Sequence, residues 1–75
     1  MKIKFKRTVT LPYIEGEEGH QKAMRGEDEY KTFWANQIVE IESLEHAEED
    51  NAYNLIFKNG HLALAAPVGT FSRVD

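Results

Sequence analysis

The chain has 75 residues, a formal net charge of −4 and no cysteine. A chain of this length folds as one small domain with a limited core, so residues 1–75 are expected to form a single domain. The lack of cysteine excludes disulfides and thiolate metal sites, and no apolar run approaches the roughly 20 residues of a membrane-spanning helix, so we expect a cytoplasmic protein with no membrane partner.

Residues 2–11, KIKFKRTVTL, alternate between apolar and polar side chains, which predicts a half-buried strand that ends near Pro12. One face of this strand carries lysines at every second position, namely Lys2, Lys4 and Lys6. Two interpretations of this row are open. The lysines could contact the phosphates of a nucleic acid, or they could form a solvated face paired with Glu40 and Glu42 of a neighbouring strand. We favour the second interpretation, because rows of charge are usually solvated.

Residues 13–32 are rich in glycine and charge, and we expect a long loop there. Two alternatives remain open. The segment could fold back as an irregular hairpin, or a helix could begin near Glu27, with apolar residues at roughly helical spacing at Tyr30, Phe33, Trp34 and Ile38. A second strand is expected over 37–44, where Val39 and Ile41 alternate with Glu40 and Glu42.

Residues 52–66, AYNLIFKNGHLALAA, predict a hairpin, because Asn59-Gly60 between two apolar runs is typical of a two-residue type I′ turn. In that register Phe57 opposes Leu62, Leu55 opposes Leu64 and Tyr53 opposes Ala66. The second face of the hairpin would then carry three apolar residues that suit self-association: Ile56, Ala63 and Ala65. We therefore expect a face on which a homo-oligomer can form.

A turn at residues 67–70 and a last strand at 71–74 complete five predicted strands: 2–11, 37–44, 52–58, 61–66 and 71–74. Short strands with turn signals predict an all-β fold, a small barrel or sandwich. The predicted core comprises Ile3, Phe5, Val9, Val39, Ile41, Tyr53, Leu55, Phe57, Leu62, Leu64 and Phe71.

The order and spacing of these strands resemble a five-stranded SH3-like barrel with a long first loop, and the closing segment AAPVGTFSRV is similar to the last turn and strand of SH3-type domains. The resemblance implies a peptide-binding groove, for which Tyr13, Trp34 and Pro67 are the candidates. The acidic and aromatic signature of signalling SH3 domains is absent. The same strand order also resembles Sm/Lsm-like proteins, which implies an RNA-binding ring of identical subunits. The arginine-glycine pair of that family is replaced by Pro67-Val68-Gly69.

The sequence does not predict an enzyme. Neither Ser43 nor Ser72 lies in a nucleophile-elbow motif, and there is no phosphate-binding glycine loop, so we expect no catalytic residue, no cofactor and no metal. We expect a binding module with a protein partner, with RNA as the alternative partner. The candidate contact residues are the exposed aromatic and proline positions Tyr13, Tyr30, Trp34 and Pro67, whereas Phe33 is expected in the core.

Overall fold

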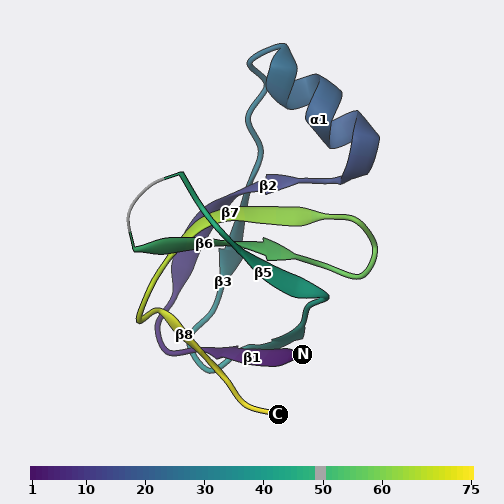
Figure 1. Cartoon of the computed structure of the whole chain (residues 1–75). Helices are drawn as coiled ribbons and strands as arrows, with labels where there is room; N and C mark the ends of the chain where they lie inside the picture. The colour runs from purple at the N-terminus through teal and green to yellow at the C-terminus, as the bar shows by residue number, and fades with distance from the viewer. Residues whose placement is uncertain (49–50) are drawn as a thin grey trace.

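The computed structural model describes residues 1–48 and 51–75 and contains eight strands and one helix in that part of the chain (Figure 1). The strands form two antiparallel sheets that do not close into a barrel, with the orders β4-β1-β8 and β3-β2-β7-β6-β5. The all-β prediction is confirmed. The elements are β1 (Lys2–Phe5), β2 (Val9–Ile14), α1 (Gly16–Met24), β3 (Tyr30–Phe33), β4 (Ile38–Glu40), β5 (Ser43–His46), β6 (Ala52–Ile56), β7 (Leu62–Pro67) and β8 (Phe71–Arg73).

The predicted first strand is present as two strands, β1 and β2, separated at residues 6–8, where the chain passes from the smaller sheet to the larger one. Its alternation is confirmed, since Ile3 and Phe5 are fully buried and Leu11 is nearly so. The expectation that Pro12 ends the strand is wrong, because β2 continues to Ile14. Proline is tolerated at this position because the ladder between β2 and β7 begins only at Tyr13, so β7 needs no N–H from residue 12. On the other side of the strand, Pro12 pairs with Tyr30 of β3.

The long loop expected at 13–32 is replaced by the end of β2, helix α1 and strand β3, and no helix begins at Glu27. Helix α1 ends in a Schellman motif: the Gly26 N–H donates to the Ala23 carbonyl (3.0 Å) and the Glu27 N–H donates to the Lys22 carbonyl (2.8 Å). Gly26 has φ of 81°, a conformation that favours glycine. These bonds cap a short, polar helix that the sequence pattern did not reveal.

The central hairpin is confirmed, but its turn contains three residues, 58–60, instead of two. The Gly60 N–H donates to the Phe57 carbonyl (3.0 Å), and the Phe57 N–H donates to the His61 carbonyl (2.9 Å). The extra turn residue shifts the pairing by one position, so that Leu55 opposes Ala63 and Ile56 opposes Leu62. Side chains on this part of β7 therefore lie on the opposite face from the predicted one.

A bulge in β7 restores the predicted register farther from the turn. Leu64 and Ala65 together oppose Asn54 of β6, and beyond them Tyr53 pairs with Ala66 as predicted. Ala65 has φ of 57°, in the left-handed region, and its N–H donates to the Asn54 Oδ1 atom (3.0 Å) instead of to a backbone carbonyl. The side chain of Asn54 thus stabilises the irregular point of the sheet.

The core lies between the two sheets and is built on stacked aromatic rings. Phe33 is 1% exposed and stacks on Phe5, with ring centroids 4.8 Å apart, and on Phe57 at 6.2 Å. Tyr13 packs edge-on against Phe57 at 5.9 Å. Of the predicted core, Ile3, Phe5, Ile41 and Leu55 are fully buried, and Val9, Val39, Phe57 and Phe71 pack against them while partly exposed.

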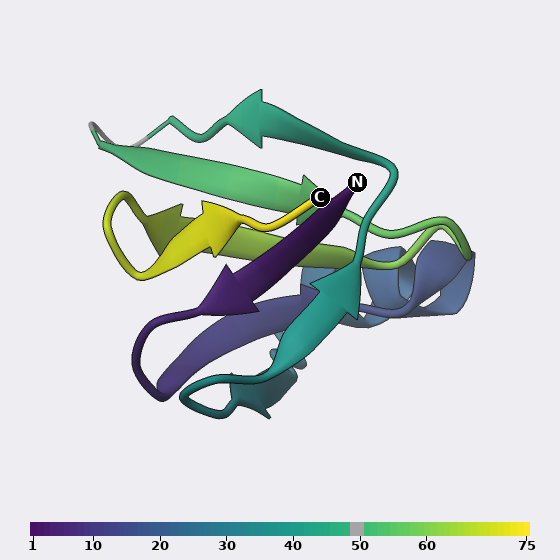
Figure 2. The same cartoon turned by 90° about the horizontal axis from the view of Figure 1, so that it is seen from below.

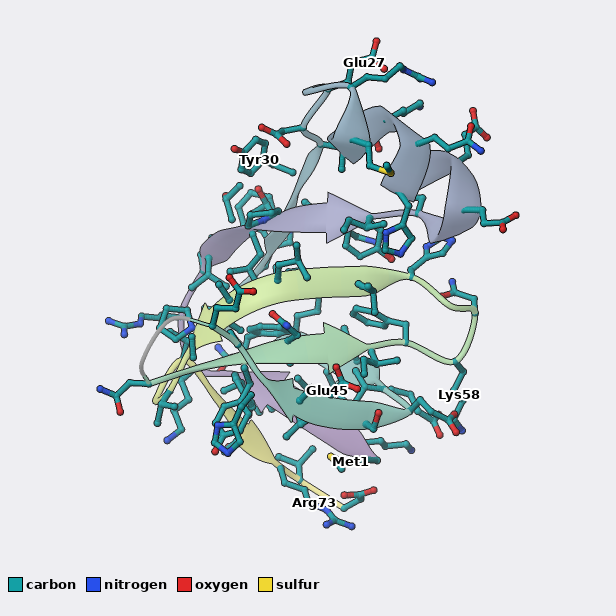
Figure 3. The ribbon with its side chains drawn as sticks, turned by 45° about the horizontal axis from the view of Figure 1, so that its top comes forward. Met1, Glu27, Tyr30, Glu45, Lys58 and Arg73 are labelled. Carbon is teal, nitrogen blue, oxygen red and sulfur yellow. The ribbon has the colours of Figure 1, made fainter. Side chains whose placement is uncertain are left out.

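The two ends of the described chain lie side by side because β1 pairs with β8 (Figure 2). The Val74 N–H donates to the Lys2 carbonyl (2.9 Å), and the terminal ammonium of Met1 lies 3.8 Å from the Asp75 carboxylate. Figure 3 shows Met1 and Arg73 close together at the end of the molecule away from Glu27, which follows α1. The helix and the terminal strands therefore occupy opposite ends.

Candidate functional site

The outer face of the five-stranded sheet, the face turned away from the aromatic core, is unusually apolar. Strand alternation places Tyr13 and Ala63 in the core, so their neighbours in β2 and β7 face outward. The outward residues from β2, β7 and β6 include the half-buried side chains of Pro12, Ile14, Leu62, Leu64, Ala65 and Ile56. An antiparallel sheet normally presents polar residues on its outer face, so this composition indicates a contact surface.

Helix α1 covers only one end of the outer face. A Cβ atom placed on Gly19 would lie 3.1 Å from the backbone carbon of Ile14 and 3.2 Å from its Cγ2 atom, so the helix rests directly on Ile14. Among the described residues, β2 is the only strand against which the helix packs appreciably. In residues 1–48 and 51–75 no other helix covers the rest of the outer face.

A hollow of about 350 Å³ opens in the uncovered part, lined by Pro12, Glu48, Asn54, Leu64 and Ala65. It lies where two irregularities meet. Proline has no N–H to donate, so the ladder between β2 and β7 stops beside it, and β7 bulges at the same level. The sheet opens at this point because neither strand continues its regular pairing.

The charge around the hollow is acidic. Glu48 lines it, and Glu45, which is exposed, stands across from Asn54 on the neighbouring strand. Figure 3 shows Glu45 on the surface of β5. Within the described chain, no Lys or Arg lines the hollow. A hollow with mixed apolar and polar lining and a carboxylate at its edge suits a ligand that combines an apolar group with a positive charge.

Three of the predicted contact residues lie on the exposed surface of the larger sheet or next to it. Tyr30 is 62% exposed and pairs with Pro12, so its ring stands beside the hollow, and Figure 3 shows it projecting from β3. Trp34 is 63% exposed but follows the other end of β3, about 13 Å farther along a strand. Pro67 is exposed at the end of β7. The structure therefore does not bring these residues into one cluster.

Tyr13 does not line a surface groove. Its side chain is 8% exposed, and its hydroxyl is hydrogen-bonded to the Nδ1 atom of His61 (3.0 Å). The Lys31 ammonium lies over its ring, 5.0 Å from the centroid. Burial, and secondarily the Glu15 carboxylate, raises the pKa of the Tyr13 hydroxyl. Tyr13 is a core residue, and the expected groove of Tyr13, Trp34 and Pro67 does not form.

The predicted oligomer face is present only in part. Ile56 and Ala65 are half-buried on the outer face, but Ala63 is fully buried against Leu55. The reason is the three-residue turn, because a shift of one position moves a strand residue to the other face. The apolar surface is instead completed by Leu62 and Leu64, which were expected in the core.

The predicted lysine row lies on the outer face of the smaller sheet, where Lys2 stands across from Glu40 and Lys4 across from Ile38. Glu40, however, accepts a hydrogen bond from Lys58 (2.7 Å), which lowers the pKa of the Glu40 carboxyl and raises that of Lys58. In residues 1–48 and 51–75 no carboxylate forms an ion pair with Lys2, Lys4 or Lys6.

The hollow residues Pro12, Asn54 and Leu64 were not predicted as a site. Pro12 gave one signal that could have been used, since it falls on the polar face of an alternating strand where no other apolar residue was expected. Asn54 and Leu64 gave none, because their position depends on the length of the turn and on the bulge.

The described residues contain no group of three or more His, Asp or Glu side chains arranged to hold a metal ion. Helix α1, at 9 residues, falls well short of the length needed to cross a membrane. No protein-family model matches the chain, and neither the curated proteins nor the solved structures give a significant match.

Proposed function

We propose that this protein is a non-enzymatic protein-interaction module that binds a basic, partly apolar segment of a partner protein in the hollow on the outer face. The observation that carries the proposal is the uncovered apolar surface around Pro12 and Leu64, with Glu48 at its edge. Apolar side chains at the centre and charges at the rim are the usual composition of a protein contact surface. Tyr30, beside Pro12, supplies the kind of exposed aromatic ring that dominates binding energy in such contacts.

The occupant is one segment of a partner chain, with an apolar side chain for the hollow and Lys or Arg beside it. The charge around the hollow sets this choice, because Glu45 and Glu48 favour a cationic neighbour and repel an anionic one. A second copy docked by the same face would bring two acidic rims together, which makes it a poorer match.

A random peptide library displayed on phage tests the proposal. Selection on the wild-type protein should enrich peptides in which an apolar residue is flanked by Lys or Arg, and amide chemical shifts should move at residues 54, 64 and 65 when such a peptide is added. Leu64→Glu should weaken binding by about tenfold or more, because a carboxylate would enter an apolar contact. Val68→Glu also introduces a glutamate in place of an apolar residue, but in the turn after β7, where Val68 is 53% exposed, so it should have little effect on peptide binding.

Glu48→Lys keeps the test decisive if Leu64→Glu fails to fold, because Glu48 is exposed and its reversal should selectively abolish binding of the basic peptides. Enrichment of acidic peptides, or equal binding by Glu48→Lys, would contradict the proposed occupant. Light scattering provides a further check. A dimer that is abolished by Leu64→Glu would show that a second copy occupies the face and would overturn the proposal.

A further inference from the structure

A second surface lies at the end of the molecule opposite α1, where two loops are held against each other. The loop at residues 6–8 joins β1 to β2, and the turn at residues 34–37 joins β3 to β4. The Asn36 N–H donates to the Phe5 carbonyl (2.7 Å), and the Ala35 N–H donates to the Thr8 Oγ1 atom (3.0 Å). Figures 1 and 2 both show the two loops side by side. Side chains from both loops therefore share one surface.

This surface, which we call the basic corner, consists of Lys4, Lys6, Arg7, Trp34 and Ile38. Lys6 and Arg7 are exposed and Lys4 is half-buried, and none of the three forms an ion pair within the described residues. Trp34 is 63% exposed and Ile38 is 57% exposed. The corner thus combines unneutralised positive charge with uncovered apolar surface in a chain that is acidic elsewhere.

The charge of the corner is available to a ligand, because in residues 1–48 and 51–75 no carboxylate forms an ion pair with Lys4, Lys6 or Arg7. The two carboxylates beside Lys2 are engaged elsewhere. Glu40 on β4 is bound by Lys58 from the hairpin turn at 2.7 Å, and Asp75 accepts hydrogen bonds from Arg73 and from the Lys2 backbone. The acidic remainder of the surface would direct an anionic ligand to this end.

The backbone of Trp34 is held by its own turn. Its backbone N–H donates to the Gln37 Oε1 atom (2.9 Å), and its carbonyl accepts from the Gln37 N–H (3.0 Å). A small domain normally buries its single tryptophan, because the ring contributes much apolar area to the core. An exposed indole at the same end of the molecule as three unpaired cations supplies the two features that bind single-stranded nucleic acids, namely a ring on which a base can stack and positive charge for the phosphates.

We propose that the basic corner binds a single-stranded nucleic acid, with one base stacked on Trp34 and the phosphates contacted by Lys4, Lys6 and Arg7. This site is separate from the hollow on the larger sheet, and either proposal can fail without the other. The nucleic acid is favoured over an acidic peptide because the planar face of Trp34 matches a base.

The test uses the intact protein and a short oligothymidylate, with the emission of Trp34 as the signal, since this is the only tryptophan of the chain. Stacking of a base should quench the emission. With about three phosphate contacts, the affinity should fall by roughly twentyfold between 50 and 200 mM salt, and the slope of log affinity against log salt should be about −2. Lys6→Gln should reduce that slope by about 0.7.

Arg25→Gln is the matched control, because it removes one positive charge at the opposite end of the molecule, where Arg25 pairs with Glu27. Its slope should equal that of the wild type. Trp34→Leu, followed by the anisotropy of a labelled oligothymidylate, should weaken binding by about tenfold or more. Arg25 and Trp34 are both exposed, so these two variants should retain the fold.

The absence of quenching or binding at low salt would overturn the proposal. So would an equal loss of affinity in Lys6→Gln and Arg25→Gln, since binding would then follow net charge alone. Polyglutamate and vesicles of anionic phospholipid distinguish other anionic partners. If either binds as tightly as the oligothymidylate, and Trp34→Leu leaves the affinity for the oligothymidylate unchanged, the corner is not a nucleic-acid site.

Discussion

Replacement of Phe33 by leucine should destabilise the protein far more than the same replacement at the next residue, Trp34. Phe33 is 1% exposed and stacks on Phe5 at 4.8 Å and on Phe57 at 6.2 Å. Leucine keeps much of the buried apolar area but loses the two stacked pairs and a tilted contact with Tyr13 at 6.4 Å. At about 0.5–1.5 kcal/mol for each stacked pair, the expected loss is about 1–3 kcal/mol. A chain of this size has a free energy of unfolding of about 4–11 kcal/mol, so Phe33→Leu should still fold.

Urea unfolding followed by far-ultraviolet circular dichroism measures both variants. For a domain this small the dependence on urea is about 1 kcal/mol per molar, so Phe33→Leu should lower the midpoint by about 1–3 M. Trp34→Leu should stay within about 0.5 kcal/mol of the wild type, because the side chain is 63% exposed. Equal shifts for the two variants, or a larger shift for Trp34→Leu, would refute the assignment of Phe33 to the core and Trp34 to the surface.

Three further predictions concern the helix and the titrating groups. Gly19→Ala should lower the melting temperature, because the new Cβ would lie only 3.1 Å from the backbone carbon of Ile14. This contact should outweigh the higher helix propensity of alanine. A higher melting temperature would show that the helix can move away from β2. Folding raises the pKa of the Tyr13 hydroxyl above its unfolded value of about 10, so this group favours the folded state below about pH 10. Its contribution to stability should be lost as the pH rises through the folded pKa. Tyr13→Phe should therefore lose less stability in alkali than the wild type, as measured by melting temperature. Hydrogen bonds from Arg73 and the Lys2 backbone lower the pKa of the Asp75 carboxyl. Its contribution to the stability of the fold is therefore present above about pH 4 and is lost as the pH falls through the folded pKa. The melting temperature of Asp75→Asn should depend less on pH in acid than that of the wild type.

The strands were predictable from the sequence because their signals are local. The alternation in residues 2–11 and the apolar runs around Asn59-Gly60 appear in the structure as β1, β2, β6 and β7. Helix α1 was missed for an equally local reason, since Gly16 and Gly19 lower helix propensity and the segment has no apolar stripe. The helix is stabilised by its capping bonds and by contact with Ile14, neither of which a periodicity search detects.

The candidate site could not be predicted, because it depends on two departures from regular pairing that act together. A three-residue turn moves Leu62 and Leu64 outward and Ala63 inward, and the bulge at Ala65 cancels the shift before Ala66. Asn-Gly is compatible with turns of either length, so the sequence does not decide between them. The exposed position of Trp34 was predicted, because it follows from strand alternation next to the buried Phe33.

The pairing of β1 with β8 determines how the domain would respond to mechanical force. Because these strands are antiparallel and hold Met1 beside Asp75, tension applied through the two ends acts across the hydrogen bonds and not along the strands. The bonds would be loaded one after another, beginning with the contacts of Asp75 with Met1 and the Lys2 N–H and continuing with the bond between Val74 and Lys2, and each would break separately. The domain would therefore unzip under low force from its terminal strands, while the larger sheet would still be intact when the first bonds opened.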